Sequence, residues 1–303
     1  MSLHHPPADP APEPLFDDDG AVFLGARRDP AGCRVGLFGV PYDGTTSFRP
    51  GTRFGPAAIR EVSGGLETYC PQLDQDLDDL AFADLGAVVT PFGAPEPVVA
   101  AVGAATRRVL DLGLAPLMLG GEHSISSGAV AAVAERHPEL VLVQLDAHAD
   151  LRDDYLGSRH SHACAMRRCL EALPSGQLLQ VAIRSGTRAE FQEMRQQARL
   201  VSIEGLAEAL SPLRGLPLYL TVDLDWFDPA VLPGTGTPEP GGFHWPDFAV
   251  LVEELRSHRL VAADVVELAP QLDPSGVSAV LAAKVVRSLL LLLGGASAPT
   301  AAQ

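Results

Sequence analysis

Residues 141–168 read VLVQLDAHADLRDDYLGSRHSHACAMRR, and this stretch decides the fold that we expect. It opens with an apolar run typical of a buried strand, and the run ends at Asp146, His148 and Asp150. Alternate residues of an extended chain point the same way. Two carboxylates with an imidazole are donors that suit manganese, iron or zinc. The stretch therefore predicts a metal site at the end of a strand.

Two other stretches place ligand-type side chains at strand ends: His123 follows the apolar residues 115–119, and Asp223 and Asp225 follow residues 217–220. A single aspartate at such a place is usually a helix cap or a turn former, and a lone histidine is more often packed than ligating. The joint pattern is different, because four carboxylates gathered together are destabilising unless cations neutralise them. It predicts a site for two divalent ions.

Strand and helix patterns alternate along the chain. We expect strands at residues 34–40, 82–88, 115–119, 140–145, 178–183, 200–203, 217–222 and 262–268, and helices at 56–61, 95–112, 124–136, 163–172, 189–197, from 204 onward, at 246–257 and at 275–293. This alternation predicts a three-layer α/β/α fold with a single doubly wound, mostly parallel sheet. Ligands of such sheets bind outside the carboxyl ends of the strands, where Glu267 also falls.

The chain shows one change of composition. Residues 1–30 are rich in proline and aspartate, a composition that cannot pack a core of its own, so we expect a flexible N-terminal arm. Residues 31–303 show no internal repeat and no further shift, which predicts one domain. An apolar run at 289–293 falls short of the roughly 20 residues of a membrane span, and we expect it to lie in a buried terminal helix.

Charge and cysteine content restrict the partners. The formal net charge of −16 at pH 7 argues against nucleic acid and anionic membranes, whose binding needs clusters of lysine and arginine. A cationic substrate fits this charge better. The 4 cysteines form no CxxC pair, and residues 1–19 lack the features of a secretory signal, so we expect a cytoplasmic protein with reduced thiols.

Several longer motifs together resemble the ureohydrolases, the family of arginases and agmatinases. They are GGEHS at 120–124, DAHAD at 146–150, the Ser161-His162 pair, TVDLDWFDP at 221–229, PGTGTPEPGG at 233–242 and DVVELAP at 264–270. The resemblance covers residues 39 to about 290. Within the family, SFRPGTRFGPAAIREVS at 47–63 is most similar to agmatinases of the bacterial type.

The resemblance implies an arginase-like fold, a centre of two Mn²⁺ ions and a homo-oligomer, either a trimer or a hexamer. The implied ligands are His123, Asp146, Asp150 and Asp223 for the first ion, and His148, Asp146, Asp223 and Asp225 for the second, so that Asp146 and Asp223 bridge. The implied catalytic residues are Asp150, which accepts the proton of the nucleophile, His162, which shuttles protons, and Glu267, which pairs with the substrate guanidinium. The implied reaction converts agmatine to putrescine and urea.

Other functions remain open at this stage. N1-aminopropylagmatine and guanidinobutyrate are alternative substrates with the same chemistry. Arginine is disfavoured, because Ser185 stands where arginases have an acidic residue and their threonine- and asparagine-rich loop is absent. A metal-dependent deacetylase with one zinc ion would need only half of the ligand set. A binding protein without activity would not need Asp150 or Glu267.

Overall fold

The computed structural model describes residues 15–18 and 20–295. The main sheet contains β1 (Phe16–Asp17), β2 (Val35–Val40), β5 (Phe82–Val88), β6 (Ala115–Gly120), β7 (Val141–Leu145), β8 (Leu178–Val181), β9 (Leu200–Val201), β10 (Pro217–Asp223) and β11 (Arg259–Val266). Their order is β1-β5-β2-β6-β11-β10-β7-β8-β9, and every pair is parallel except β1 with β5. A separate hairpin pairs β3 (Tyr69–Cys70) with β4 (Gln75–Asp76).

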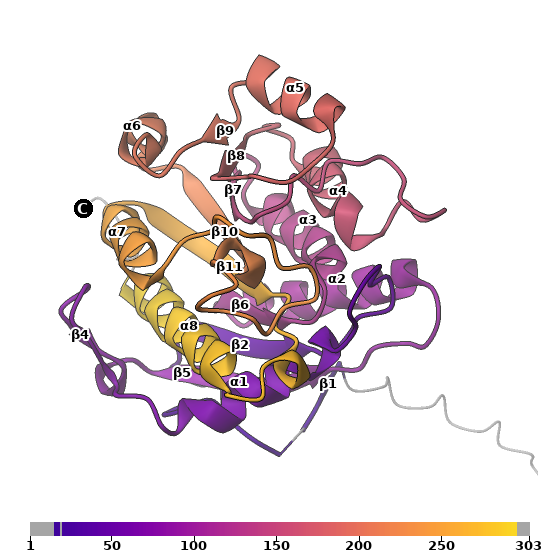
Figure 1. Ribbon diagram of the computed structural model, residues 1–303. Coiled ribbons are helices and arrows are strands. Elements are labelled where there is room, and N and C mark those ends of the chain that lie inside the picture. The colour runs from indigo at the N-terminus through magenta and orange to yellow at the C-terminus, as the bar shows by residue number, and fades with distance from the viewer. Residues whose placement is uncertain (1–14, 19, 296–303) are drawn as a thin grey trace, which may run out of the picture.

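Helices cover both faces of this sheet (Figure 1). They are α1 (Gly55–Ser63), α2 (Pro95–Asp111), α3 (Ser126–Arg136), α4 (Ala165–Ala172), α5 (Arg188–Gln196), α6 (Leu206–Leu210), α7 (Trp245–Leu255) and α8 (Val277–Gly295). Buried side chains of α1, α6, α7 and α8 join one hydrophobic core, and those of α2, α3, α4 and α5 join the other. The predicted three-layer fold with a mostly parallel sheet is confirmed.

Strand β2 shows how the sheet separates the two cores. Val35 and Leu37 belong to the core on the α8 side, whereas Phe38 and Val40 belong to the core on the α2 side. All of β2 is buried, because successive side chains of a strand point to opposite faces and both faces carry helices. A continuous apolar run is therefore what a central strand of this fold requires.

Helix α8 is the longest apolar segment in the described part of the chain. By length and by a mean hydropathy of 1.9 it could cross a membrane, but 78% of its apolar window is buried inside the fold. Its polar residue Arg287 is buried and donates hydrogen bonds to the backbone oxygens of Glu67 and Tyr69. The expectation of a buried terminal helix is confirmed.

The expected domain boundary at residue 30 concerns a segment that is described only in part, since residues 1–14 and 19 lie outside the described ranges. Part of the segment packs on the domain, namely Phe23, Leu24 and Ala26. Phe23 is fully buried, and its backbone N–H donates to Asp84 Oδ2 at 2.9 Å. The short β1 lies along the edge of the sheet beside β5.

Most of the predicted strands differ from the structure by one to three residues at an end, and the last strand differs most. The last strand was expected at residues 262–268 but spans Arg259–Val266. Glu267 follows it with a φ of 67°, a left-handed conformation that is incompatible with a strand. The strand therefore stops one residue before the glutamate, and the backbone turns Glu267 out of the sheet.

Candidate metal centre and active site

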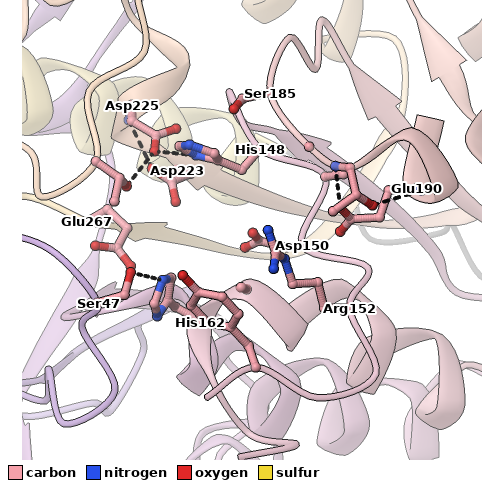
Figure 2. A pocket seen from close by; sticks show the side chains of 16 residues that line it. Ser47, His148, Asp150, Arg152, His162, Ser185, Glu190, Asp223, Asp225 and Glu267 are labelled. Atoms are coloured by element: carbon pink, nitrogen blue, oxygen red, sulfur yellow. Dashed lines mark hydrogen bonds and ion pairs between the residues drawn. The ribbon is translucent and has the colours of Figure 1, made fainter.

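Four adjacent central strands, in the order β6-β11-β10-β7, deliver the predicted site residues at their carboxyl ends. His123 lies in a short 3₁₀ turn after β6, and Asp223 is the last residue of β10. Because parallel strands end at the same edge of a sheet, side chains from distant parts of the sequence meet there. The structure thus brings together His123, Asp146, His148, Asp150, Asp223, Asp225 and Glu267. Figure 2 labels all of these except His123 and Asp146.

The first group of ligand-type atoms surrounds His123. Its Nδ1 atom lies 3.1 Å from Asp146 Oδ2, 3.2 Å from Asp150 Oδ2 and 3.2 Å from Asp223 Oδ2. All four residues are buried. One imidazole nitrogen and three carboxylate oxygens therefore face a common point.

The second group surrounds His148. Its Nδ1 atom lies 2.9 Å from Asp225 Oδ2 and 3.6 Å from Asp146 Oδ1. Asp146 thus presents one oxygen to each group. The His148 side chain keeps 27% of its surface exposed, so this group borders the cavity rather than the core.

The hydrogen bonds of His123 show that the first group fits a metal ion. Its Nε2 atom lies 2.9 Å from Thr221 Oγ1, and Thr221 donates its own proton to Asp264 Oδ1 at 2.6 Å. Thr221 must therefore accept from Nε2–H, and in the neutral ring, the form that binds a metal, this leaves Nδ1 without a proton. This buried Nδ1 forms no hydrogen bond with any described residue and faces three carboxylates. An unprotonated imidazole nitrogen among carboxylates is the donor set of a divalent cation.

The pKa values of two carboxyl groups reflect the crowding of acidic side chains at this site. Burial and the neighbouring charge of Asp146 raise the pKa of Asp150 to about 6. Burial, together with the charges of Asp225 and Asp146, raises the pKa of Asp223 well above its usual range. Such crowding of acidic groups is unfavourable, and divalent cations would relieve it.

Polar residues next to the ligands hold them in place through hydrogen bonds. Gln144 donates to Asp146 Oδ2 at 2.7 Å, and Arg184 donates to the backbone oxygen of Asp225 at 2.7 Å. These two residues, like Thr221 and Asp264, were not predicted. A signal existed, since Gln144 and Thr221 are polar residues in apolar strands, each two positions before a ligand and thus on the same face.

Four of the ligand-type residues border a cavity of about 260 Å³: His148, Asp150, Asp223 and Asp225. Glu267 lines it, and one oxygen of its carboxylate accepts the backbone N–H of His123 at 2.7 Å. The other oxygen forms no hydrogen bond with any described residue. Burial and the charge of Glu122 raise the pKa of Glu267 well above its usual range. Glu267 therefore offers a free carboxylate oxygen to a cationic group in the cavity.

His162 reaches the cavity from a 3₁₀ turn before α4. Its Nδ1 atom lies 3.0 Å from the Thr45 carbonyl oxygen, and its Nε2 atom lies 3.1 Å from Ser47 Oγ. Its ring meets Tyr155 edge to face at 5.9 Å between centroids. Burial lowers the pKa of His162 below its usual value.

Arg152 is a further residue of the cavity that the sequence analysis missed. Its guanidinium lies 4.5 Å from the ring centroid of Tyr155, and both residues line the cavity. In Figure 2 Arg152 reaches into the space beside Asp150. Arg152 forms no ion pair with any residue that the structure describes. A guanidinium without an ionic partner favours an anionic group in the molecule that occupies this cavity.

Comparisons with known proteins agree with the fold and the motifs. The agmatinase of Bacillus subtilis is 39% identical over 284 residues, which cover 91% of this chain and 98% of that protein. The N(1)-aminopropylagmatine ureohydrolase of Thermococcus kodakarensis is 34% identical, covering 83% of this chain and 88% of that protein. The crystal structure of a putative agmatinase from Clostridium difficile superposes with a TM-score of 0.83 at 37% identity, covering 87% of this chain and 98% of that one. The family model of the arginase family matches residues 33–292, and the chain therefore belongs to the arginase family.

Proposed function

We propose that this protein hydrolyses the guanidinium group of agmatine to putrescine and urea, using two manganese ions. The observation that carries the proposal is the convergence of two imidazole–carboxylate groups and a separate buried glutamate, Glu267, on one cavity. The names of relatives with up to 39% identity support agmatine as the substrate. We place the enzyme in the cytoplasm, as a homo-oligomer.

The proposed ligands follow the two groups of the site. His123, Asp146, Asp150 and Asp223 would hold one ion, and His148, Asp146, Asp223 and Asp225 the other. Two divalent ions held there would neutralise the carboxylates and activate water as a nucleophile near neutral pH. The sharing of Asp146 between both groups supports a centre of two ions rather than the single zinc ion of a deacetylase.

Glu267 binds the substrate in this proposal. A guanidinium is resonance-stabilised, so its central carbon is a poor electrophile and must be held accurately before the nucleophile. The free oxygen of Glu267 can accept charge-assisted hydrogen bonds from the guanidinium. Its other oxygen is fixed by the backbone of His123, so the contact also positions the substrate next to the metal ligands.

Asp150 and His162 transfer protons in this proposal. Asp150 accepts the proton of the attacking water and returns it to the departing amine. This role is supported by its place at the cavity, next to the other proposed ligands. His162, at the cavity wall, exchanges protons with solvent between turnovers.

A urea-release assay tests the proposal directly. Protein loaded with manganese should release urea from agmatine far faster than the uncatalysed reaction does. Metal analysis should find about two ions per chain. Absence of urea release from agmatine and from every other guanidino compound would reject the function and favour a binding protein. A single tightly bound zinc ion would favour the deacetylase.

Arg152 supports a second candidate, guanidinobutyrate, because an unpaired cation in the cavity favours a substrate with an anionic tail. N1-aminopropylagmatine is a third candidate, on the strength of the relative from Thermococcus kodakarensis. One panel with agmatine, guanidinobutyrate, N1-aminopropylagmatine and arginine separates these cases. If guanidinobutyrate is the substrate, Arg152→Ala should lower its kcat/KM and leave that of agmatine unchanged or higher.

A further inference from the structure

Both ring nitrogens of His162 have a hydrogen-bond partner in this structure. Nδ1 lies 3.0 Å from the carbonyl oxygen of Thr45, and Nε2 lies 3.1 Å from the hydroxyl oxygen of Ser47. A carbonyl oxygen only accepts, so Nδ1 carries a proton in both the neutral and the charged ring. Proton exchange is therefore left to Nε2, which faces Ser47.

Ser47 lies beside His162 in the wall of the cavity. It lines the cavity and is exposed, whereas His162 is only partly accessible. Figure 2 shows the contact of the two side chains as a dashed line. A serine hydroxyl can donate one hydrogen bond while it accepts another. A proton that leaves Nε2 on this side therefore meets the Ser47 oxygen first.

The backbone on both sides of Ser47 is anchored. Two residues before it, Thr45 donates from its backbone N–H and its hydroxyl to the two carboxylate oxygens of Glu122, at 2.7 Å and 2.5 Å. Two residues after it, Arg49 donates to the backbone oxygen of Thr235 at 2.6 Å. An exposed loop serine would otherwise move freely. These anchors hold the Ser47 hydroxyl at the distance from His162 that proton transfer requires.

We propose that Ser47 is a proton-relay residue that links His162 to the substrate; this rests on the proposed guanidinium hydrolysis. As the bond between the central carbon and the departing nitrogen breaks, its electron pair stays on that nitrogen. Asp150 has by then given this nitrogen one proton, so the amine leaves neutral. The Ser47 hydroxyl proton then passes to its electron pair to form the ammonium, and Ser47 Oγ takes the Nε2 proton of the charged His162. Hydroxyl and ring end neutral, and His162 regains a proton from solvent.

Three variants test the relay on the metal-loaded enzyme. Ser47→Ala removes the hydroxyl, and Ser47→Thr keeps it. Thr46→Val is the matched control in the same loop, because the Thr46 hydroxyl is buried without a hydrogen bond to any described residue. For each variant we would measure metal content, kcat and KM for agmatine, and the solvent deuterium isotope effect on kcat.

Ser47→Ala should lower kcat by about tenfold or more, since general acid–base catalysis contributes about 10²- to 10⁴-fold and a water molecule can replace part of it. KM and metal content should stay near those of the unsubstituted protein, and the isotope effect should rise. Ser47→Thr should recover most of kcat, and Thr46→Val should lose none.

Two results would overturn the relay. One is a kcat of Ser47→Ala within twofold of the unsubstituted protein with the same isotope effect. The other is an equal loss in Ser47→Thr or Thr46→Val, which would point to the shape of the loop instead of the hydroxyl. An unsubstituted protein that hydrolyses no guanidino compound would reject the proposed function itself, and with it this role.

Discussion

The Nε2 atom of His123 lies 2.9 Å from the Thr221 hydroxyl oxygen, and this contact determines which ring nitrogen faces the carboxylates. Thr221 in turn donates to Asp264, which also accepts the hydroxyl of Tyr219 at 2.7 Å. A buried chain of hydrogen bonds, from Tyr219 through Asp264 to Thr221, therefore orients the ring of His123. Metal affinity should depend on this chain although none of its members is a ligand.

Thr221→Val tests this dependence. Valine has nearly the same shape but cannot accept a hydrogen bond from Nε2–H. The tautomer of His123 with an unprotonated Nδ1 is then no longer favoured. We expect metal affinity to fall by about 10- to 100-fold, measured by titration of metal-free protein. Thr235→Val is a matched control, because the Thr235 hydroxyl is buried without a hydrogen bond to any described residue. Equal affinities of the two variants would contradict the orienting role.

Asp223→Asn tests the bridging assignment. Asparagine keeps the shape and removes the charge that both proposed ions share, so the metal content should fall towards one ion or none. The content is measured by elemental analysis after dialysis. Asp146→Asn should behave in the same way, since Asp146 lies near both histidines. Two ions retained in Asp223→Asn would show that this residue does not bridge.

Glu267→Gln separates a guanidinium enzyme from other hydrolases with two metals. The metal count should stay near two, because Glu267 is not a proposed ligand. Loss of a hydrogen bond to a charged group costs about 1.5–3 kcal/mol, and poorer positioning adds to this. We expect kcat/KM for agmatine to fall by at least about tenfold. Near-normal turnover would mean that the cavity receives another class of substrate.

The raised pKa of Asp150, about 6 against a usual 3.8, predicts how metal and pH act together on stability. The folded metal-free protein holds this proton more tightly than the unfolded chain. The resulting stability is complete below about pH 3.8 and is lost as the pH rises through about 6. Metal requires the ionised form, so manganese should raise the melting temperature more at about pH 8 than at about pH 5. An equal rise at both values would argue against Asp150 as a ligand.

The oligomeric state is a further prediction. We expect a trimer or a hexamer, as the resemblance to ureohydrolases implies. Light scattering on the purified protein at micromolar concentration measures the mass directly. A mass of 31.9 kDa, that of one chain, would refute the prediction.

The sequence predicted those parts of the fold that leave a periodic pattern. The strand at residues 82–88 was predicted with the bounds that the structure shows, because apolar residues dominate FADLGAV and directly follow the acidic stretch at residues 74–79. Strands β1, β3 and β4 were not predicted. Each has two residues, which is too short for any alternation to be visible.

The ligands were predictable for the same reason, since they follow strand ends in sequence order. Ser47 and Arg184 were not, because their roles arise from contacts between segments distant in sequence. Arg184, for example, donates to the backbone oxygens of Asp225 and Glu239, both more than 40 positions away. No local pattern marks an arginine that binds backbone oxygens of remote loops.

The two edges of the sheet have a consequence for assembly and solubility. The outermost strands, β1 and β9, contain two residues each, and β1 runs antiparallel to β5. Such short borders expose few unpaired backbone groups, so they are poor templates for the addition of a strand from a second chain. The predicted association of subunits should therefore use helices and loops. Strand β1 (Phe16–Asp17) pairs with the outer edge of β5. Its removal would expose the backbone of this seven-residue strand to pairing with a strand of another molecule.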